Sequence, residues 1–416
     1  MIMYFKNKLF KNFSYLLIIN ITSLIIPFVS YPYLIRVFGS EEFGKILYIQ
    51  SCSLLFLIIV DFGFNLSAVR DVSIFRDDKE KLDQLVSNVL AIKIFIVMLG
   101  ALVLSFYLLF SNKNDIENKM YVLTYVYCVG NAIFIQWYYQ GVEKMQIPAI
   151  ISVIIKIVML MMIFIFVRDK NDILEYIAIY SGSAFFIGLV SVLYAMCYCC
   201  FRLRVPNYKL MRSFFYESFP FFLSRFSGIF ILRITPIIIG RYIGIQFVAY
   251  YDLAEKLVNM LLTPLNIINQ VIYPNVAKTK NIALVMRVIK VIFPLCMICY
   301  IISFFVSPYF IEVFAGNEML FSANIFQITS LLLPIASLNY LLGNCVLIVN
   351  GKVDEFNKSV FFGFVFYVLY MSCIYSFDFF DINFIVFGVV INSVFILLFR
   401  VFFILKTPLI INQINR

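Results

Sequence analysis

Two arginines lie inside one apolar stretch of the sequence that is long enough to cross a bilayer. Arg225 and Arg233 fall within residues 213–240, and their spacing is slightly more than two helical turns. A helix over this stretch places both guanidinium groups on one face. Because each guanidinium can bind two phosphate oxygens at once, the pattern favours a diphosphate ligand.

Further charged residues fall inside other apolar stretches. The cations are Lys93, Lys156 and Lys256, and the acids are Asp61, Asp252 and Glu255. A charge at bilayer depth costs about 3 kcal/mol or more, so we expect these side chains to face a water-filled cavity. Together with the two arginines, the cations outnumber the acids. The pattern therefore predicts a cationic cavity and an anionic cargo.

Depth along the expected helices pairs some of these charges. Asp61 and Lys93 should each lie about 14 Å from the same side of the bilayer, from a rise of about 1.5 Å per residue. They can therefore form an ion pair, which either locks two helices together or serves transport. Arg233 and Glu255 are the corresponding partners in the second half of the chain. If Glu255 neutralises Arg233, Arg225 is the better candidate for binding cargo.

Lys156 differs from the other cations because no acid is near it in sequence, which favours a role in binding cargo. Several amides add polarity inside the apolar stretches. They either hydrogen-bond between helices or line the cavity and bind sugars. The amides that we select as cavity-lining candidates are Asn20, Gln136 and Asn259.

The composition is that of a membrane protein. Of 416 residues, 63% are hydrophobic and 13% are charged, about half the charged fraction of an average soluble domain. Histidine is absent, so the sequence predicts neither a metal site nor catalytic residues of the usual kind. We expect no cofactor; coupling to H⁺ or Na⁺ would use Asp61, Asp252 or Glu255. The net charge of +10 fits loops beside anionic lipid rather than nucleic-acid binding.

Breaks at charged, glycine and proline clusters predict an all-α polytopic protein with about twelve transmembrane helices. With the N-terminus inside, the cytoplasmic segments hold 21 Lys and Arg and the opposite loops hold 7, so both termini should be cytoplasmic. The predicted spans are 13–35, 46–69, 85–110, 119–141, 148–167, 174–199, 213–240, 246–276, 282–307, 320–349, 357–377 and 382–405.

The basic loop at 200–212 divides these helices into two lobes of six, residues 1–204 and residues 205–416. A faint internal repeat supports this division, because Gly39, Phe43, Gly44 and Ile46 match Gly244, Val248, Ala249 and Tyr251 at a constant offset. In each lobe the cluster joins the first helix to the second. The sequence thus predicts a transporter built from two parallel repeats.

An aromatic run occurs near the end of the fourth predicted span. Gln136 is followed by Trp137, Tyr138 and Tyr139. Trp and Tyr gather at membrane–water interfaces, so we interpret this run as an interfacial belt rather than a platform on which sugars stack.

Several motifs resemble those of one transporter family. The chain is similar in their order and spacing to the Wzx-type flippases of the polysaccharide transport family, most clearly in its N-terminal half. The residues that carry the resemblance are Tyr31-Pro32-Tyr33-Leu34-Ile35-Arg36-Val37-Phe38-Gly39, Glu42-Phe43-Gly44, Asp61-Phe62-Gly63-Phe64, Arg70-Asp71 and Gln136-Trp137-Tyr138-Tyr139-Gln140-Gly141.

The resemblance implies the multidrug/oligosaccharidyl-lipid/polysaccharide (MOP) exporter superfamily, with two six-helix lobes as in multidrug exporters of the MATE type. It implies a flippase that moves undecaprenyl-pyrophosphate-linked sugar repeat units, for O-antigen or for capsular or other exopolysaccharide, from the cytoplasmic to the periplasmic leaflet by alternating access. It also implies the bacterial inner membrane, and a glycan polymerase and a chain-length regulator as partners.

Two other functions compete with this one. A polytopic glycan polymerase or ligase binds the same lipids, but it usually has a large periplasmic loop with catalytic groups, and the longest outer loop here, about residues 308–319, has no Lys or Arg. A multidrug exporter of the same fold would need an acidic cavity for cationic drugs. We therefore expect a transporter of anionic lipid and not an enzyme.

Overall fold

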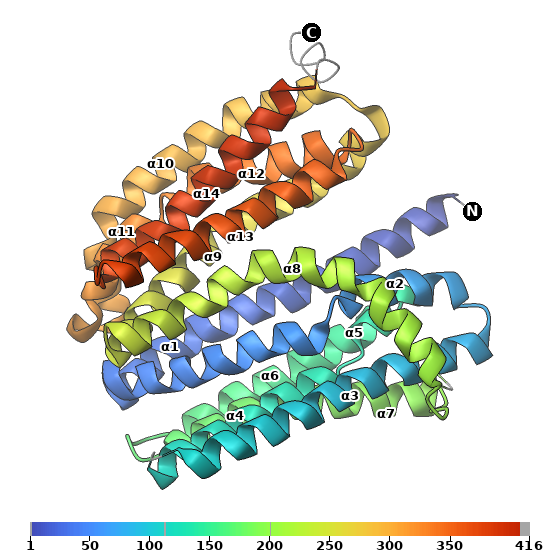
Figure 1. The fold of residues 1–416 in the computed structure, drawn as a ribbon, viewed down its shortest axis with the longest axis horizontal. Helices are drawn as coiled ribbons and strands as arrows, with labels where there is room; N and C mark the ends of the chain where they lie inside the picture. Colours follow the sequence, from blue (N-terminus) through green and yellow to red (C-terminus); the bar gives the residue numbers. More distant parts are fainter. Residues whose placement is uncertain (1, 112–113, 200, 408–416) are drawn as a thin grey trace. The chain divides into compact units, whose positions relative to one another are not determined.

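Helices make up the described chain. The computed structural model describes the backbone of residues 2–111, 114–199 and 201–407, with side chains except at residues 2–13, 16 and 224. All regular elements within these residues are helical (Figure 1), which confirms the predicted all-α class. Many large apolar side chains remain exposed on the helices, as expected where lipid rather than water surrounds them.

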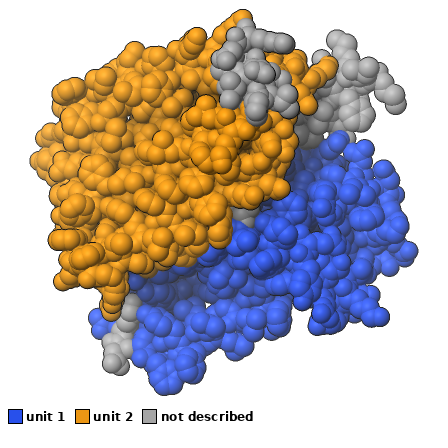
Figure 2. Space-filling view, turned by 45° about the horizontal axis from the view of Figure 1, so that its top comes forward, with its two compact units in different colours: residues 1–42, 46–226 blue, residues 43–45, 227–416 orange. Residues whose placement is uncertain are grey.

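The chain forms two compact units, distinguished by colour in Figure 2. Unit 1 consists of residues 1–42 and 46–226, and unit 2 of residues 43–45 and 227–416. The division falls inside α8 (Tyr208–Tyr242), which bends between Leu223 and Arg225. It lies beyond the expected lobe boundary at 204/205, because the first part of α8 hydrogen-bonds to α2 of unit 1.

Unit 1 is a bundle in which α7 lies against α4 and α6, and α3 lies against α4 (Figure 1). A short helix, α5, packs on α2. The helices of this unit, besides the first part of α8, are α1 (Ile2–Asp61), α2 (Phe64–Phe75), α3 (Lys79–Phe110), α4 (Asp115–Ile133), α5 (Gln136–Gly141), α6 (Gln146–Phe166) and α7 (Ile173–Tyr198).

Unit 2 is built around α14, which contacts α11, α12 and α13. The predicted span 320–349 is divided here into α11, α12 and a π-helical segment, η2. Besides the last part of α8, the unit contains α9 (Ile245–Thr279), α10 (Ile282–Ala315), the 3₁₀ turn η1 (Asn317–Met319), α11 (Phe321–Thr329), α12 (Leu332–Tyr340), η2 (Leu341–Ile348), α13 (Val353–Ser376) and α14 (Ile382–Leu405).

The glycines that open the predicted repeat behave alike. Gly39 has φ 74° and interrupts α1, and Gly244 has φ 152° and precedes α9. Residues with a side chain rarely adopt such angles, so glycine serves at both positions. The backbone thus turns in the same place in each half, between the first and second predicted helices.

Eight helices among the described residues are long and apolar enough to cross a membrane, or nine if the bent α8 is one span. One of the eight, Leu17–Phe75, covers most of the predicted span 13–35 and all of 46–69, because α1 continues through the kink at Gly39. The protein is therefore a multi-pass membrane protein. The count of twelve stays a prediction, as does the cytoplasmic location of both termini.

The aromatic run is not an interfacial belt, so that interpretation was wrong. Trp137 and Tyr139 expose 1% and 0% of their surface, and Tyr138 is also buried. The Tyr139 hydroxyl donates to the Ser191 carbonyl oxygen at 2.6 Å. These rings fill the core of unit 1 because α4 ends at Ile133 and α5 begins at Gln136, which turns them inward.

Candidate functional site

Two of the predicted charged residues, Asp61 and Lys93, meet at a break between two helices of unit 1. α1 ends at Asp61, and Phe62 and Gly63 have positive φ before α2 begins. Lys93 Nζ donates to Asp61 Oδ1 at 2.9 Å, and Asn65 Nδ2 donates to Asp61 Oδ2 at 2.9 Å. The predicted pairing of Asp61 with Lys93 is thus confirmed. Lys93 is 1% exposed, whereas the Asp61 side chain is 33% exposed.

Lys156 is bound by a neutral partner. Its Nζ donates to Ser23 Oγ at 2.7 Å, and the Ser23 hydroxyl donates in turn to the Ile19 carbonyl oxygen at 2.8 Å. No described carboxylate forms an ion pair with Lys156. Its positive charge is therefore available to an anion, and its binding of cargo stays a prediction.

Arg225 follows the bend of α8 and is half-buried. In the part of the chain that the structure describes, its guanidinium has neither a hydrogen bond nor an ion pair. It belongs to unit 1, and Arg233 belongs to unit 2. The joint binding of a diphosphate by the two arginines stays a prediction.

In unit 2 the acids of α9 bind partners on their own helix. Lys256 Nζ lies 3.6 Å from Asp252 Oδ1, and Asn259 Nδ2 donates to Glu255 Oε1 at 3.5 Å. Arg233 acts on Glu255 only beyond the 4.0 Å limit of an ion pair. The predicted partners Arg233 and Glu255 thus attract one another without forming an ion pair within 4.0 Å, and Glu255 hydrogen-bonds to the residue four positions along its own helix.

The polar candidates differ in their surroundings. Asn20 is exposed on α1, and Gln136 is half-buried as the first residue of α5. Asn259, which holds Glu255, is also half-buried. A cavity-lining role for these three residues stays a prediction.

Arg400 is a buried cation of unit 2 that is not among the residues predicted from the sequence. Arg400 is 6% exposed. Its Nη1 donates to the Asn339 carbonyl oxygen at 2.5 Å, its Nε donates to Ser359 Oγ at 3.2 Å, and its guanidinium lies 4.6 Å from the centre of the Phe356 ring. No described carboxylate forms an ion pair with it. One signal was present, since Arg400 lies inside the last predicted span, 382–405.

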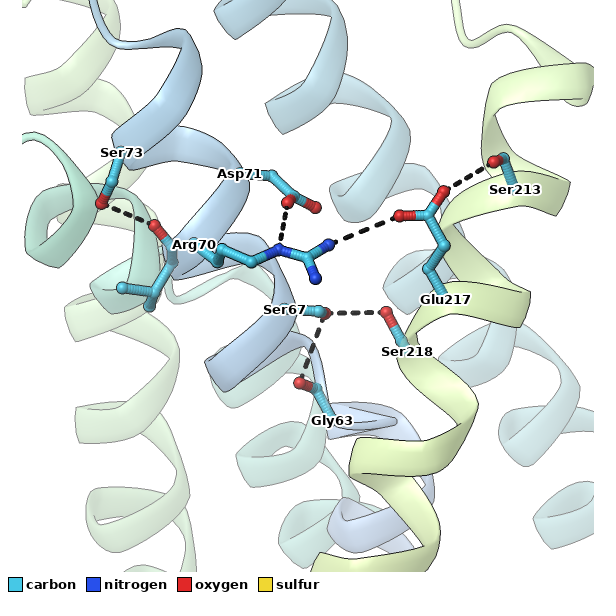
Figure 3. Close-up of polar contacts among 9 residues, drawn as sticks. Gly63, Ser67, Arg70, Asp71, Ser73, Ser213, Glu217 and Ser218 are labelled. Atoms are coloured by element: carbon cyan, nitrogen blue, oxygen red, sulfur yellow. Dashed lines mark hydrogen bonds and ion pairs between the residues drawn. The ribbon is translucent and has the colours of Figure 1, made fainter. Parts of the chain in front are cut away.

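A second feature missed from the sequence is a polar contact between α2 and the first part of α8, shown in Figure 3. We call it the α2–α8 contact, and it consists of Ser67, Arg70, Glu217 and Ser218. The two serine hydroxyls lie 2.7 Å apart and are buried. Arg70 Nη2 donates to Glu217 Oε2 at 3.4 Å, and both of these side chains are about half-exposed. The contact joins the loop-proximal end of α8 to unit 1.

Stacked rings extend this attachment of α8. Phe62, at the helix break, stacks on Phe215 and Phe222, with ring centres 4.0 and 4.7 Å away. Such pairs add to the energy of burial. The helix break that exposes Asp61 is thus also the place where α8 docks.

Most of the chain is similar to known proteins. Residues 9–280 match the family described as Polysaccharide biosynthesis protein. A protein of Shigella dysenteriae named "Putative O-antigen transporter" is 25% identical over 374 residues, which cover 86% of this chain and 91% of that protein.

Two solved structures share the fold. Lipid II flippase MurJ in an inward closed conformation has a TM-score of 0.75 and 13% identity, and the match covers 94% of this chain and 87% of that chain. An inward-facing multidrug resistance MATE family transporter of the MOP superfamily has a TM-score of 0.66 and 12% identity, with 91% and 97% covered. The predicted MATE-like MOP fold is therefore confirmed.

Proposed function

Because this chain belongs to the polysaccharide biosynthesis protein family, we propose that it is a flippase for lipid-linked sugar repeat units. Its cargo is an undecaprenyl-pyrophosphate-linked oligosaccharide, which the name of the Shigella relative, "Putative O-antigen transporter", supports. The protein is a transporter and not an enzyme. It acts in the bacterial inner membrane and moves cargo from the cytoplasmic to the periplasmic leaflet by alternating access.

The observation that carries this proposal is the set of cations within apolar helices that lack a carboxylate at ion-pair distance. Among the described residues, Lys156 binds only a serine, Arg225 has no polar partner, and Arg233 has no ion pair within 4.0 Å. An unpaired charge at this depth is costly unless a ligand or water compensates it. A diphosphate supplies two negative groups that guanidinium binds well. Lys256 is a weaker candidate because Asp252 pairs with it.

The coupling ion and the protein partners also belong to this proposal. Asp61, Asp252 and Glu255 are the acids through which H⁺ or Na⁺ would drive the cycle. Asp61 is the most accessible of the paired acids, since its side chain is 33% exposed, against 12% for Asp252. A glycan polymerase and a chain-length regulator would use the repeat units that the flippase delivers.

The test is a leaflet assay in proteoliposomes with an undecaprenyl-pyrophosphate oligosaccharide and a membrane-impermeant probe of the sugar. We expect the wild-type protein to move the lipid and Arg225→Ala to reduce the rate at least tenfold, about 1.4 kcal/mol. Arg225→Lys should retain part of the rate, because it keeps the charge and loses the fork. Arg241→Ala is the matched control, since Arg241 is exposed near the end of the same helix.

The outcomes are distinct. No movement by the wild-type protein would contradict the flippase function. Growth of the glycan on adding acceptor would instead favour a polymerase. Normal movement by Arg225→Ala would leave the function intact and remove Arg225 from the cargo site.

A further inference from the structure

Unit 1 contains an apolar groove that the proposed function does not yet use. Its volume is about 1150 Å³, and its walls come from α1, α3, α4 and the first turns of α8. This is slightly larger than the pockets that hold drug-sized molecules, about 300–1000 Å³. Of the lining residues that the structure describes, Arg212 alone carries a charge.

Most of the groove wall is apolar, and two of its polar groups bond to backbone carbonyl oxygens. The Tyr125 hydroxyl donates to the Val97 carbonyl oxygen, and Cys128 Sγ donates to the Ser53 carbonyl oxygen at 3.5 Å. The surface that remains is made of rings and aliphatic chains such as Phe56, Phe95 and Leu99. An occupant of this surface is therefore apolar over most of its length.

The groove has a charged end and an uncharged end. α8 begins beside α3, where the Arg204 and Asn207 amides donate to Ser87 Oγ and Asn88 Oδ1 at 2.9 and 2.8 Å. Arg212, in the first turns of α8, is thus at the end near the basic loop that charge asymmetry assigns to the cytoplasm. At the other end, Tyr107 and Tyr121 lie ring to ring.

The length of the groove restricts its occupant. Its lining residues on α3 run from Ile92 to Tyr107, which is about 22 Å at the helical rise. One leaflet of a bilayer has a hydrocarbon thickness of only about 15 Å, half of the usual core. The groove is therefore longer than the hydrocarbon part of one leaflet is thick.

We propose that this groove binds the polyisoprenoid chain of the lipid diphosphate cargo, with Arg212 beside a phosphate. The inference rests on the proposed flippase function and names a chain-binding site for it. The distribution of charge in the groove is complementary to such a lipid. Arg212 would face the anionic head group, and the apolar wall would face the long chain. Holding the chain on unit 1 keeps it in lipid while the polar head crosses.

The groove contributes orientation more than affinity. Lipid chains already provide an apolar environment, so only close packing favours the groove over the bilayer. The affinity of the groove should then differ only several-fold between lipids, so experiments must compare closely matched probes.

The first experiment uses the full-length protein in nanodiscs and a polyisoprenyl diphosphate whose chain carries a diazirine. We expect crosslinks in α3, α4 and the start of α8. Leu99→Trp should reduce crosslinking about fivefold by filling the groove, a modest change in affinity. Met98→Trp is the matched control: Met98 is also exposed on α3 but does not line the groove, and it should remain within about twofold of wild type.

The second experiment tests the head-group end. Arg212→Gln should lower crosslinking of the diphosphate several-fold and leave the uncharged polyisoprenol unchanged. Lys209→Gln is the control, because Lys209 is an exposed cation one turn away that does not line the groove. Equal effects of the two substitutions would mean that surface charge, rather than Arg212, attracts the lipid.

Three results would overturn the chain-binding site. They are crosslinks outside the groove, no difference between Leu99→Trp and Met98→Trp, and equal competition by phosphatidylglycerol, which would indicate a general lipid surface. The leaflet assay on the wild-type protein separates the two proposals. Movement without groove crosslinks would reject the groove and keep the flippase, while groove crosslinks without movement would keep the binding site and reject transport.

Discussion

Among the residues that the structure describes, each unit buries one cation almost completely, and the two are stabilised in different ways. Lys93 in unit 1 is 1% exposed and faces the carboxylate of Asp61. Arg400 in unit 2 is 6% exposed and faces a carbonyl, a hydroxyl and an aromatic ring. The Lys93 ammonium is balanced by an opposite charge, whereas the Arg400 guanidinium is surrounded by neutral groups that hydrogen-bond to it or stack on it. Burial alone therefore does not identify a cation that can act on an anion; its partners do.

The largest effect should come from removing the acid of the unit 1 pair. Asp61→Asn leaves Lys93 buried without a counter-charge and should lower the free energy of unfolding by about 3–5 kcal/mol. Lys93→Met should cost clearly less, because the Asp61 that remains is partly exposed. Denaturation in mixed micelles would measure both. A larger loss for Lys93→Met would contradict the asymmetry in burial.

Reversing the pair sharpens the same point. Asp61→Lys and Lys93→Asp should each prevent stable folding or stop transport. The double variant should regain about half of the lost free energy of unfolding, on the order of 2 kcal/mol. The regain comes from restoring opposite charges at one site. A double variant no better than the worse single variant would show that the pair depends on geometry that the swap destroys.

Arg400 should tolerate loss of its charge better than the unit 1 pair does. Arg400→Met removes a buried charge and leaves no opposite charge behind, so the lost hydrogen bonds are partly offset by the relief of desolvation. We expect a cost of about 1–2 kcal/mol in the same micelle assay. A cost as large as that of Asp61→Asn would mean that a carboxylate comes close to Arg400 in another state of the cycle.

The smallest effects are expected at the α2–α8 contact. Ser218→Ala removes one of the paired hydroxyls, but the Ser67 hydroxyl still has the Gly63 carbonyl oxygen at 3.4 Å, so the cost should stay below about 1 kcal/mol. Arg70→Gln should cost still less, since exposed ion pairs contribute about 0.2–1 kcal/mol and salt screens them. Repeating the measurement at high salt should remove the Arg70 effect and keep that of Ser218. The reverse order would show that charge dominates this contact.

Contacts between side chains could be predicted from the sequence where depth in the bilayer alone decides them. Asp61 and Lys93 are each about nine residues from the same side of the bilayer, so helical rise brings them to one level. Contacts could not be predicted where the arrangement of neighbouring helices decides which side chains meet. Glu255 bonds within α9 rather than to Arg233, and Arg400 is buried only because Asn339 and Ser359 come from other helices. A single sequence does not show which helices pack against one another.

Helix breaks were the other gap. Hydropathy averages over windows and does not detect the interruption at Phe62 and Gly63, the division of 320–349 into three segments, or the turn that buries Trp137. These interruptions depend on one or two residues and on what packs beside them. They also set the candidate site, since the break after Asp61 positions its carboxylate toward Lys93.

Residues Phe43–Lys45 belong to unit 2, although the chain on both sides of them belongs to unit 1. A Cβ on Gly44 would lie 2.2 Å from the Ile245 carbonyl oxygen, so only a bare Cα fits there. During synthesis this glycine leaves the ribosome long before Ile245 exists. The contact between Gly44 and the start of α9 can therefore form only after the second half of the chain has been made. A bulky residue at Gly44 would block assembly at that late step.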